Sequence, residues 1–209
     1  IDTVIYALDQ GINYFDMAGA YAAIFPAYGK ALEGRRKEAM LQVHFGPDYS
    51  TGEYGWSLDL EKIKRSVDFQ LKNLKTDYMD FGFIHCLDED SDLTTYEENG
   101  VMDFVLEMKK QGVIKRLGFS THAPHMANVI LDRKMIDVLM FSINPMYDYG
   151  QGEYARGTDD ERHLLYQRCE KEGIGISVMK PFNAGQLLDA KKSPFHQADR
   201  KSTRLNSSH

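Results

Sequence analysis

The sequence predicts an α/β fold built on a parallel sheet. Six short apolar runs, rich in β-branched and aromatic residues, recur along the chain at residues 12–16, 39–44, 78–85, 115–120, 138–144 and 174–180. Segments with helical spacing lie between most of these runs. Strands that alternate with helices run parallel and are covered on both faces, so they are apolar almost throughout, as these runs are.

The helical segments place apolar residues at steps of three and four. The first residues of the chain already follow such a pattern. Residues 59–74 repeat it over four turns, and Ser57 or Asp59 is suited to cap the first turn. Residues 101–111 and 159–172 show the same spacing, and a glycine follows each of them, as at many helix ends. The predicted order is therefore helix, strand, helix, strand.

The strand ends favour a (β/α) barrel over an open doubly wound sheet. An open sheet that binds a dinucleotide is usually marked by G-x-G-x-x-G, and no predicted strand is followed by that motif. Instead, polar residues stand at the carboxyl ends of all six runs: Asp16, His44, His85, Ser120 with Thr121, Asn144 and Lys180. In (β/α) barrels, this end of the strands carries the active site.

Composition and charge exclude several classes of protein. The chain has 209 residues, of which 43% are apolar, and a net charge of −6, which describes one domain large enough to bury a core. No apolar run approaches the ~20 residues that cross a bilayer, and the start lacks the features of a signal peptide. Basic residues are dispersed, which argues against nucleic acid as a partner. We expect a cytoplasmic protein without a membrane or nucleic-acid partner.

No metal centre is predicted. The two cysteines, Cys86 and Cys169, lie far apart without a C-x-x-C motif, so we expect two small core residues and neither a zinc site nor a disulfide. His122 and His125 could form a metal pair, but no third ligand is evident, so we interpret them as loop histidines. Residues 46–55 resemble a loop long enough to line a substrate pocket.

The final segment, residues 199–209, differs from the rest of the chain. It is polar and without periodicity. One permitted codon for each residue gives a sequence that resembles the start of a widely used short-read library adapter. We therefore expect a non-native tail that is a translated sequencing adapter, and we exclude it from fold reasoning. A natural disordered tail is the alternative. The predicted domain is an incomplete barrel over residues 1–198.

Several stretches resemble the motifs of the aldo-keto reductase family. GINYFDMAGAY (11–21) is similar to the family's G-I-N-x-F-D-T-A-x-x-Y, with Met17 in place of threonine. TDYMDFGFIHCLD (76–88), GVIKRLGFST (112–121) and GIGISVMKPFNAGQLL (173–188) are similar to later motifs, in the family's order. The resemblance implies a partial (β/α)8 TIM barrel in which strands 2 to 7 are present and the first and last units are missing.

The resemblance also implies an activity and its residues. Hydride would pass from a nicotinamide cofactor, NADPH or NADH, to the carbonyl of a small aldehyde or ketone. By position, Tyr21 would be the general acid, Asp16 would orient and polarise the site, and His85 would direct the carbonyl. The residues expected to bind the cofactor are Ser120, Thr121, Asn144 and Lys180. These roles suit the chemistry, because the alkoxide that hydride addition forms needs a proton and hydrogen bonds at its oxygen.

One position departs from the family pattern. The family has a lysine at the end of the third strand that activates the tyrosine, whereas this chain has His44. A protonated His44 paired with Asp16 would keep a positive charge near Tyr21, and a neutral imidazole would not. We expect His44 to be catalytic and the pH optimum to be more acidic than in relatives with lysine. The histidine resembles a bacterial branch that often carries an iron–sulfur segment, which implies a cluster in the missing C-terminal part.

Other functions use the same residues. A cofactor-binding regulatory relative without turnover is compatible with the absent lysine, and a barrel lyase or isomerase could use the same acid and base groups. Each side chain also has a structural role open to it: Asp16 could cap a turn, Tyr21 could be an aromatic at the edge of the core, and His85 could be a satisfied interior histidine. A barrel without its end units has open sheet edges, so we expect this chain alone to be inactive.

Overall fold

A six-stranded parallel sheet forms the centre of the protein. The computed structural model describes residues 1–152, 154–189 and 191. The strand order is β1-β2-β5-β6-β7-β8, and every neighbouring pair is parallel. These strands are β1 (Tyr14–Asp16), β2 (Met40–Phe45), β5 (Met79–Ile84), β6 (Ile114–Thr121), β7 (Val138–Ser142) and β8 (Gly175–Met179). Each overlaps one of the six predicted runs.

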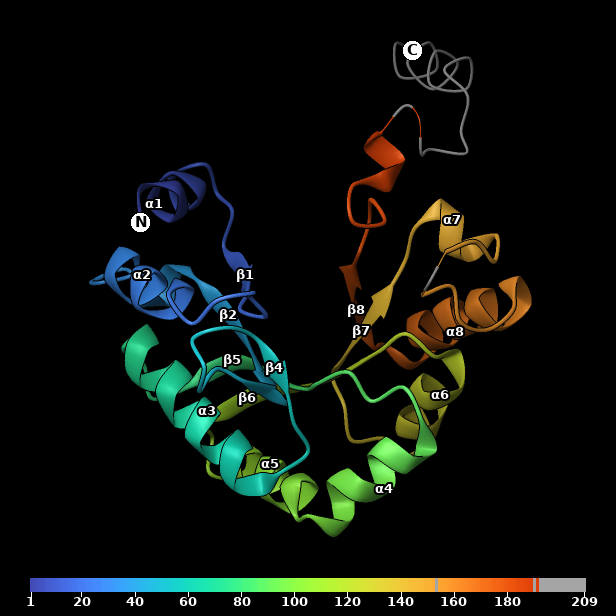
Figure 1. Cartoon of the computed structure of the whole chain (residues 1–209), viewed down its shortest axis with the longest axis horizontal. Coiled ribbons are helices and arrows are strands. Elements are labelled where there is room, and N and C mark those ends of the chain that lie inside the picture. The colour runs from blue at the N-terminus through green and yellow to red at the C-terminus, as the bar shows by residue number, and fades with distance from the viewer. Residues whose placement is uncertain (153, 190, 192–209) are drawn as a thin grey trace.

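The sheet curls into an open half-barrel (Figure 1). Strands β1 and β8 are its two edges and face one another across the opening. The structure therefore confirms the predicted α/β class and the partial (β/α)8 barrel. The segment 199–209, which we expect to be non-native, lies outside the described residues, as do residues 192–198 of the expected domain.

Helices cover the outer side of the curled sheet (Figure 1). They are α1 (Asp2–Asp9), α2 (Ile24–Ala31), α3 (Leu60–Leu74), α4 (Asp90–Glu98), α5 (Val101–Lys110), α6 (Pro124–Asp132), α7 (Pro145–Asp148) and α8 (Asp159–Glu172), with short 3-10 helices at Arg36–Glu38 and Gln186–Leu188. Within the described part of the chain, none of these helices has the length and apolar character that crossing a membrane requires.

Local capping signals explain where the predicted helices begin. The Asp59 carboxylate accepts a hydrogen bond from the backbone amide of Lys62 at 2.8 Å, which fixes the start of α3. Thr158 and Glu161 form a reciprocal capping box at the start of α8, and this helix ends at Gly173. Helices α4 and α6 were not predicted from the spacing of apolar residues.

Close packing between β5 and β6 requires a glycine. Phe83 pairs with His44 on one side and with Gly118 on the other, so the three lie at one level of the sheet. A β-carbon on Gly118 would lie 2.5–2.6 Å from three ring atoms of Phe83. The missing side chain therefore makes room for the Phe83 ring inside the barrel, directly beneath the strand ends.

Residues 46–55, interpreted from the sequence as a loop, fold into part of a hairpin. Its strands are β3 (Pro47–Asp48) and β4 (Gly55–Trp56), which pair antiparallel. The hairpin is bonded to the loop after β1: the Tyr54 amide donates to the Ala20 carbonyl and the Ala22 amide donates to the Gly52 carbonyl, each at 2.9 Å. An isolated antiparallel bridge joins Tyr21 to Glu53. The hairpin thus packs beside the carboxyl end of β1.

Candidate active site

A pocket of about 530 Å³ lies at the carboxyl ends of the strands. Its lining includes four of the predicted site residues, which come from four different strand ends: Asp16, His85, Ser120 and Lys180. The hairpin contributes Tyr54, and the loop between α7 and α8 contributes Tyr154. The volume is in the range of ~300–1,000 Å³ typical of small-molecule sites. The predicted ring of polar strand ends is therefore partly assembled around one pocket.

A continuous chain of four side chains runs through this site. The Asp16 Oδ1 lies 2.8 Å from His44 Nε2, and His44 Nδ1 lies 2.9 Å from His85 Nδ1. The other ring nitrogen of His85, Nε2, lies 2.9 Å from the Tyr54 hydroxyl. The imidazoles are buried, with His44 1% and His85 9% exposed. The structure thus brings Asp16, His44 and His85 together, as the strand-end argument predicts.

Tyr21 is not part of this chain. Its side chain is 59% exposed and does not line the pocket. The bridge with Glu53 explains this position, because residues directly opposite one another on antiparallel strands share a face and successive residues alternate between faces. Tyr54 faces the pocket, so Glu53 and its partner Tyr21 face solvent. The phenol at the imidazole belongs to Tyr54, which the sequence analysis did not single out.

Burial and neighbouring groups set the charges in the chain. Burial, reinforced by His44, holds the pKa of His85 well below its usual value, so His85 is neutral at pH 7. Burial alone would raise the pKa of Asp16, but the hydrogen bond and charge of His44 outweigh it and lower that pKa. Burial, with a contribution from Cys86, raises the pKa of Tyr54 to about 12, so the phenol keeps its proton at neutral pH.

A second polar chain holds Lys180 at the pocket. The Asp88 Oδ2 lies 2.9 Å from His122 Nδ1, and the Lys180 Nζ lies 3.0 Å from His122 Nε2. The other Asp88 oxygen accepts from the Thr121 hydroxyl at 2.8 Å and the His122 amide at 2.6 Å. Lys180 also lies 4.3 Å from the centre of the Tyr154 ring. His122, expected to be a loop histidine, therefore links a carboxylate to the ammonium group.

Asp88 is a member of the second chain that the sequence analysis did not single out. Asp88 closes the motif 76–88, which is the signal that could have drawn attention to it. Burial would raise the pKa of Asp88, but the hydrogen bonds from His122 outweigh burial and lower that pKa to about 2. Thr121 is fully buried, and its hydroxyl also accepts from the Ala123 amide at 3.1 Å. In this arrangement, Thr121 supports the carboxylate and does not line the pocket.

The residues around His122 include a group that could hold a metal ion. Ligand atoms of Cys86, Asp88 and His122 all lie within 4.8 Å of one another, so His122 belongs to a different group from the pair that the sequence suggested. Cys86 is half-buried at the pocket instead of in the core, whereas Cys169 is buried as expected. His125 is not in the group, because it pairs with Asp90 at the surface. Both ring nitrogens of His122 already have polar partners: Nδ1 contacts Asp88, and Nε2 contacts the Lys180 ammonium.

Ser120 and Asn144, both predicted to bind a cofactor, occupy different environments. Ser120 lies at the end of β6 and lines the pocket. The Asn144 side chain caps α7, accepting from the Tyr147 amide at 3.1 Å, and its amide donates to the Lys180 carbonyl at 2.9 Å. Asn144 therefore fixes the backbone that carries Lys180, and Ser120 presents its side chain to the pocket.

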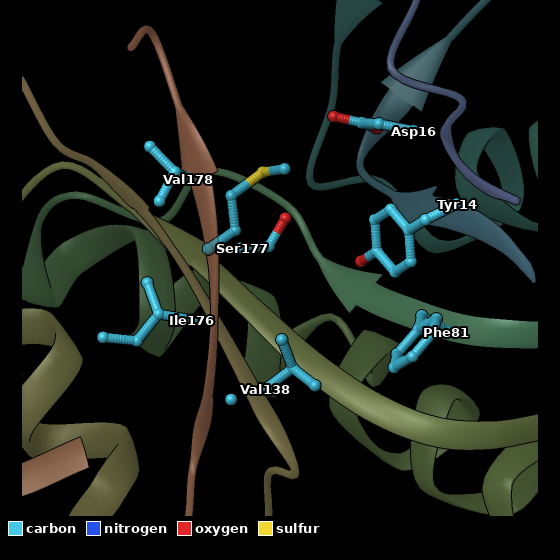
Figure 2. A pocket seen from close by; sticks show the side chains of 9 residues that line it. Tyr14, Asp16, Phe81, Val138, Ile176, Ser177 and Val178 are labelled. Carbon is cyan, nitrogen blue, oxygen red and sulfur yellow. The ribbon is translucent and has the colours of Figure 1, made fainter. Parts of the chain in front are cut away.

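A second pocket, of about 500 Å³, opens between β1 and β8 (Figure 2). Tyr14 and Asp16 line one side, Ser177 lies on the other, and Ile176 and Val178 point away from Tyr14. The Gln42 side chain accepts from the hydroxyls of Tyr14 and Ser177, the second at 3.4 Å. Its amide nitrogen lies 2.9 Å from His44 Nε2. Asp16 lines both pockets, so the inside of the half-barrel adjoins the site.

Comparison with known proteins identifies the class to which this fold and site belong. Residues 1–208 match the model of the aldo/keto reductase family, and the chain belongs to that family.

Individual relatives are similar over part of their length. The uncharacterized oxidoreductase YqkF of Bacillus subtilis is 30% identical over 144 residues, which is 66% of this chain and 45% of YqkF. Aldo-keto reductase yakc [NADP(+)] of Schizosaccharomyces pombe is 28% identical over 198 residues, which is 90% of this chain and 54% of yakc. The holo structure of aldo-keto reductase AKR11C1 from Bacillus halodurans superimposes with a TM-score of 0.67 at 25% identity, covering 88% of this chain and 58% of that one. The chain thus spans about half the length of these curated relatives.

Proposed function

We propose that the protein reduces the carbonyl of a small aldehyde or ketone by hydride transfer from NADPH or NADH. Membership of the aldo/keto reductase family supports this reaction, and the S. pombe relative carries NADP(+) in its name. The observation that carries the proposal for this chain is the buried series Asp16, His44 and His85, which ends in the pocket. Such a series can supply protons and hydrogen bonds to a carbonyl oxygen.

The residues of the pocket fit a nicotinamide. When bound, the reduced ring supplies a hydride to the carbonyl carbon. The Ser120 hydroxyl, at the end of β6, would bind the carboxamide of the ring, and Lys180 would contribute a positive charge to the same pocket. Thr121 and Asn144 are also predicted to contact the cofactor. Thr121 would act through the Asp88 carboxylate that it holds, and Asn144 through the Lys180 backbone that it holds.

The proton donor predicted from the family motif is Tyr21. Its phenol would have to turn from solvent into the pocket, which the bridge to Glu53 opposes. His85 is neutral, and its Nε2 would hold the carbonyl oxygen in place of the Tyr54 hydroxyl, which lies 2.9 Å from it. The iron–sulfur cluster that the bacterial branch implies is a prediction about the parent protein, and the described cysteines do not bear on it.

Binding of NADPH and its oxidation test the proposal in the full-length parent protein, because this chain alone is expected to be inactive. Ser120→Ala is expected to weaken NADPH binding about three- to tenfold, the effect of losing one hydrogen bond of ~0.5–1.5 kcal/mol. Ser142→Ala is the matched control, because Ser142 lies at the end of the neighbouring strand and its buried hydroxyl has no partner among the described residues. Binding is measured by fluorescence titration, and turnover by loss of NADPH absorbance with 4-nitrobenzaldehyde.

The outcomes separate the candidate functions. Tight NADPH binding with turnover supports the reductase. Binding without oxidation by any carbonyl indicates the regulatory relative, and failure to bind either nicotinamide cofactor indicates a barrel with other acid–base chemistry. Equal NADPH affinity in the two serine variants would contradict the role given to Ser120.

A further inference from the structure

Cys86 and its neighbour His85 both line the pocket at the strand ends. In an extended strand, successive side chains point to opposite faces, so two adjacent residues do not normally line one cavity. Cys86 has a left-handed backbone, with a φ of 54°, a conformation that residues other than glycine rarely adopt. This turn lies just after β5 and redirects the chain, which places the thiol in the pocket wall beside the second polar chain.

The thiol lies next to two other groups that bind metals. Cys86 Sγ is 3.8 Å from His122 Nδ1, and this nitrogen is 2.9 Å from Asp88 Oδ2. All three residues line the pocket, and their ligand atoms lie within 4.8 Å of one another. Within the described part of the chain, no other three such side chains come as close. A tetrahedral zinc ion with ligands at ~2.0–2.3 Å holds them about 3.5 Å apart, so the spacing suits one ion.

We propose that Cys86, Asp88 and His122 bind a zinc ion in the wall of the pocket. Thiolate, imidazole and carboxylate are the side chains that coordinate zinc in proteins. The hard ions Mg²⁺ and Ca²⁺ take oxygen ligands, so the sulfur and nitrogen atoms disfavour them. Because all three residues line the pocket, the fourth position of the tetrahedron faces it, and water completes the coordination there.

Hydrogen bonds outside the ligand set hold the carboxylate in position. Asp88 Oδ1 accepts from the Thr121 hydroxyl at 2.8 Å and from the His122 amide at 2.6 Å. Thr121 is fully buried, so this support is shielded from water. The other oxygen, Oδ2, is thereby directed to His122 Nδ1, where the ion would lie. Outer partners that orient a ligand in this way raise the affinity for a metal.

The ion would replace the proton that lies between Asp88 and His122. The pKa of Asp88 is lowered to about 2, so its carboxylate is ionised at neutral pH and the hydrogen of this contact belongs to His122 Nδ1. Burial raises the pKa of the Cys86 thiol to about 11, so the ion must displace that proton too. Zinc takes an electron pair from Nδ1 and one from the thiolate. The imidazole proton moves to Nε2, and the thiol proton passes to solvent.

Lys180 and the ion exclude one another at His122. Lys180 Nζ lies 3.0 Å from His122 Nε2, which accepts from the ammonium as long as Nδ1 carries the hydrogen. Once zinc holds Nδ1, Nε2 becomes a donor and the ammonium has to leave it. The centre of the Tyr154 ring, 4.3 Å from Nζ, offers the ammonium another partner. Zinc binding therefore moves the positive group that is predicted to bind the cofactor.

An ion at this position would inhibit carbonyl reduction. It would lie in the pocket that His85 and Ser120 also line, and it would displace Lys180. This consequence rests on the proposed function, whereas the metal site itself does not.

The absorbance of bound Co²⁺ tests the site in the full-length parent protein without reference to activity. Thiolate-bound Co²⁺ has a charge-transfer band in the near ultraviolet, and we expect Zn²⁺ but not Mg²⁺ to displace it. Loss of an outer partner alone costs ~10–100-fold in metal affinity, so Cys86→Ala is expected to weaken Co²⁺ binding at least about 100-fold. Cys169→Ala is the matched control, because it removes the other, buried thiol, and its affinity should equal that of the wild type. Thermal melting confirms that both variants fold.

Alkylation of the wild type provides a readout that needs no variant. Peptide mass spectrometry follows the rate at which iodoacetamide modifies Cys86. The thiolate is the reactive form and coordination withdraws it, so saturating Zn²⁺ is expected to slow the reaction at least about tenfold, and Mg²⁺ to leave it unchanged.

The competition at His122 has a test of its own. Lys180→Met removes a like charge and the contact at Nε2, so it is expected to bind Co²⁺ about tenfold more tightly than the wild type. Equal or weaker binding by this variant would overturn the competition between Lys180 and the ion.

The remaining outcomes separate the site from its effect. Equal Co²⁺ affinity of the wild type and Cys86→Ala, or alkylation of Cys86 that Zn²⁺ does not slow, overturns the site. Zn²⁺ is expected to inhibit NADPH oxidation by 4-nitrobenzaldehyde in the wild type and Cys169→Ala but not in Cys86→Ala, and binding without inhibition overturns the effect on the pocket. A wild type that binds Co²⁺ as expected but oxidises no NADPH contradicts the proposed function and supports the site.

Discussion

Replacement of Gly118 by alanine tests whether packing of Phe83 fixes the position of the buried His44 imidazole. The new β-carbon would lie 2.5–2.6 Å from three ring atoms of Phe83, whereas carbon atoms in contact are normally ~3.5–4.0 Å apart. Phe83 is fully buried, and its ring centre lies 5.4 Å from that of His44, so the ring cannot retreat without moving the imidazole.

The expected magnitude follows from this overlap. Overpacking a core costs ~1–3 kcal/mol, and an overlap of about 1 Å with three ring atoms puts Gly118→Ala near the upper end. Gly175→Ala is the control on the edge strand, because its β-carbon would be 3.6 Å from the nearest atom, an ordinary contact. That change is expected to alter the free energy of unfolding by less than ~0.5 kcal/mol.

Urea denaturation gives the free energy of unfolding of both variants, and single-turnover NADPH oxidation reports the site. Gly118→Ala should lose stability and rate together, since Phe83 is pushed toward His44. Equal stability of the two variants, within ~0.5 kcal/mol, would refute the packing argument. A Gly118→Ala protein that is destabilised but keeps its full rate would refute the connection between Phe83 and the site.

Three further predictions concern charge and capping. The pKa of Asp88 is lowered from 3.8 to about 2, which corresponds to about 2 kcal/mol of stability that is present above pH 4. The wild type loses this stability as the pH falls from about 4 to about 2, and Asp88→Asn should lack it at every pH. Denaturation curves of the two proteins should therefore differ above pH 4 and converge near pH 2. Thr158→Ala removes the reciprocal cap of α8 and should cost about 1 kcal/mol in urea denaturation, and no measurable loss would contradict the capping role. His44→Lys should move the pH optimum of turnover toward alkaline values, because an ammonium stays charged to higher pH than an imidazole, and an unchanged pH profile would argue against a role for His44 in proton delivery.

Most of the fold could be predicted because its signals are local. The strands are apolar runs, and helix α3 carries both its spacing and the Asp59 cap within its own sequence. The hairpin could not be predicted in this way. Its strands are only two residues each, and it is held by backbone bonds to residues 20–22, which no local pattern encodes.

The residues of the site also divide into those that a local pattern predicts and those that depend on distant contacts. Asp16, His44 and His85 could be expected to meet because the carboxyl ends of neighbouring parallel strands share one edge of the sheet. The direction in which the Tyr21 side chain points depends on backbone pairing with Glu53, which lies on the hairpin, far along the sequence. A motif fixes the position of Tyr21 along the sequence but not the face on which its side chain lies.

The second polar chain was hidden for a related reason. His122 lies 34 residues from Asp88 and 58 from Lys180, so their contacts arise only when β5, β6 and β8 are aligned. Taken singly in the sequence, His122 and Asp88 are polar residues of loops, and Lys180 is a charged residue of the kind usually found at the surface. The curvature of the sheet is what converts them into one network.

The end of β2 carries a residue whose small size has consequences for substrate choice. A β-carbon on Gly46 would lie 2.9 Å from the β-carbon of His85, so only glycine lets the following hairpin approach the imidazole so closely. The hairpin then brings the Tyr54 ring to the edge of the pocket. With a bulkier residue here, we expect the hairpin to stand farther from His85 and the pocket to widen. The absence of a side chain at position 46 thus sets how near the hairpin lies to His85.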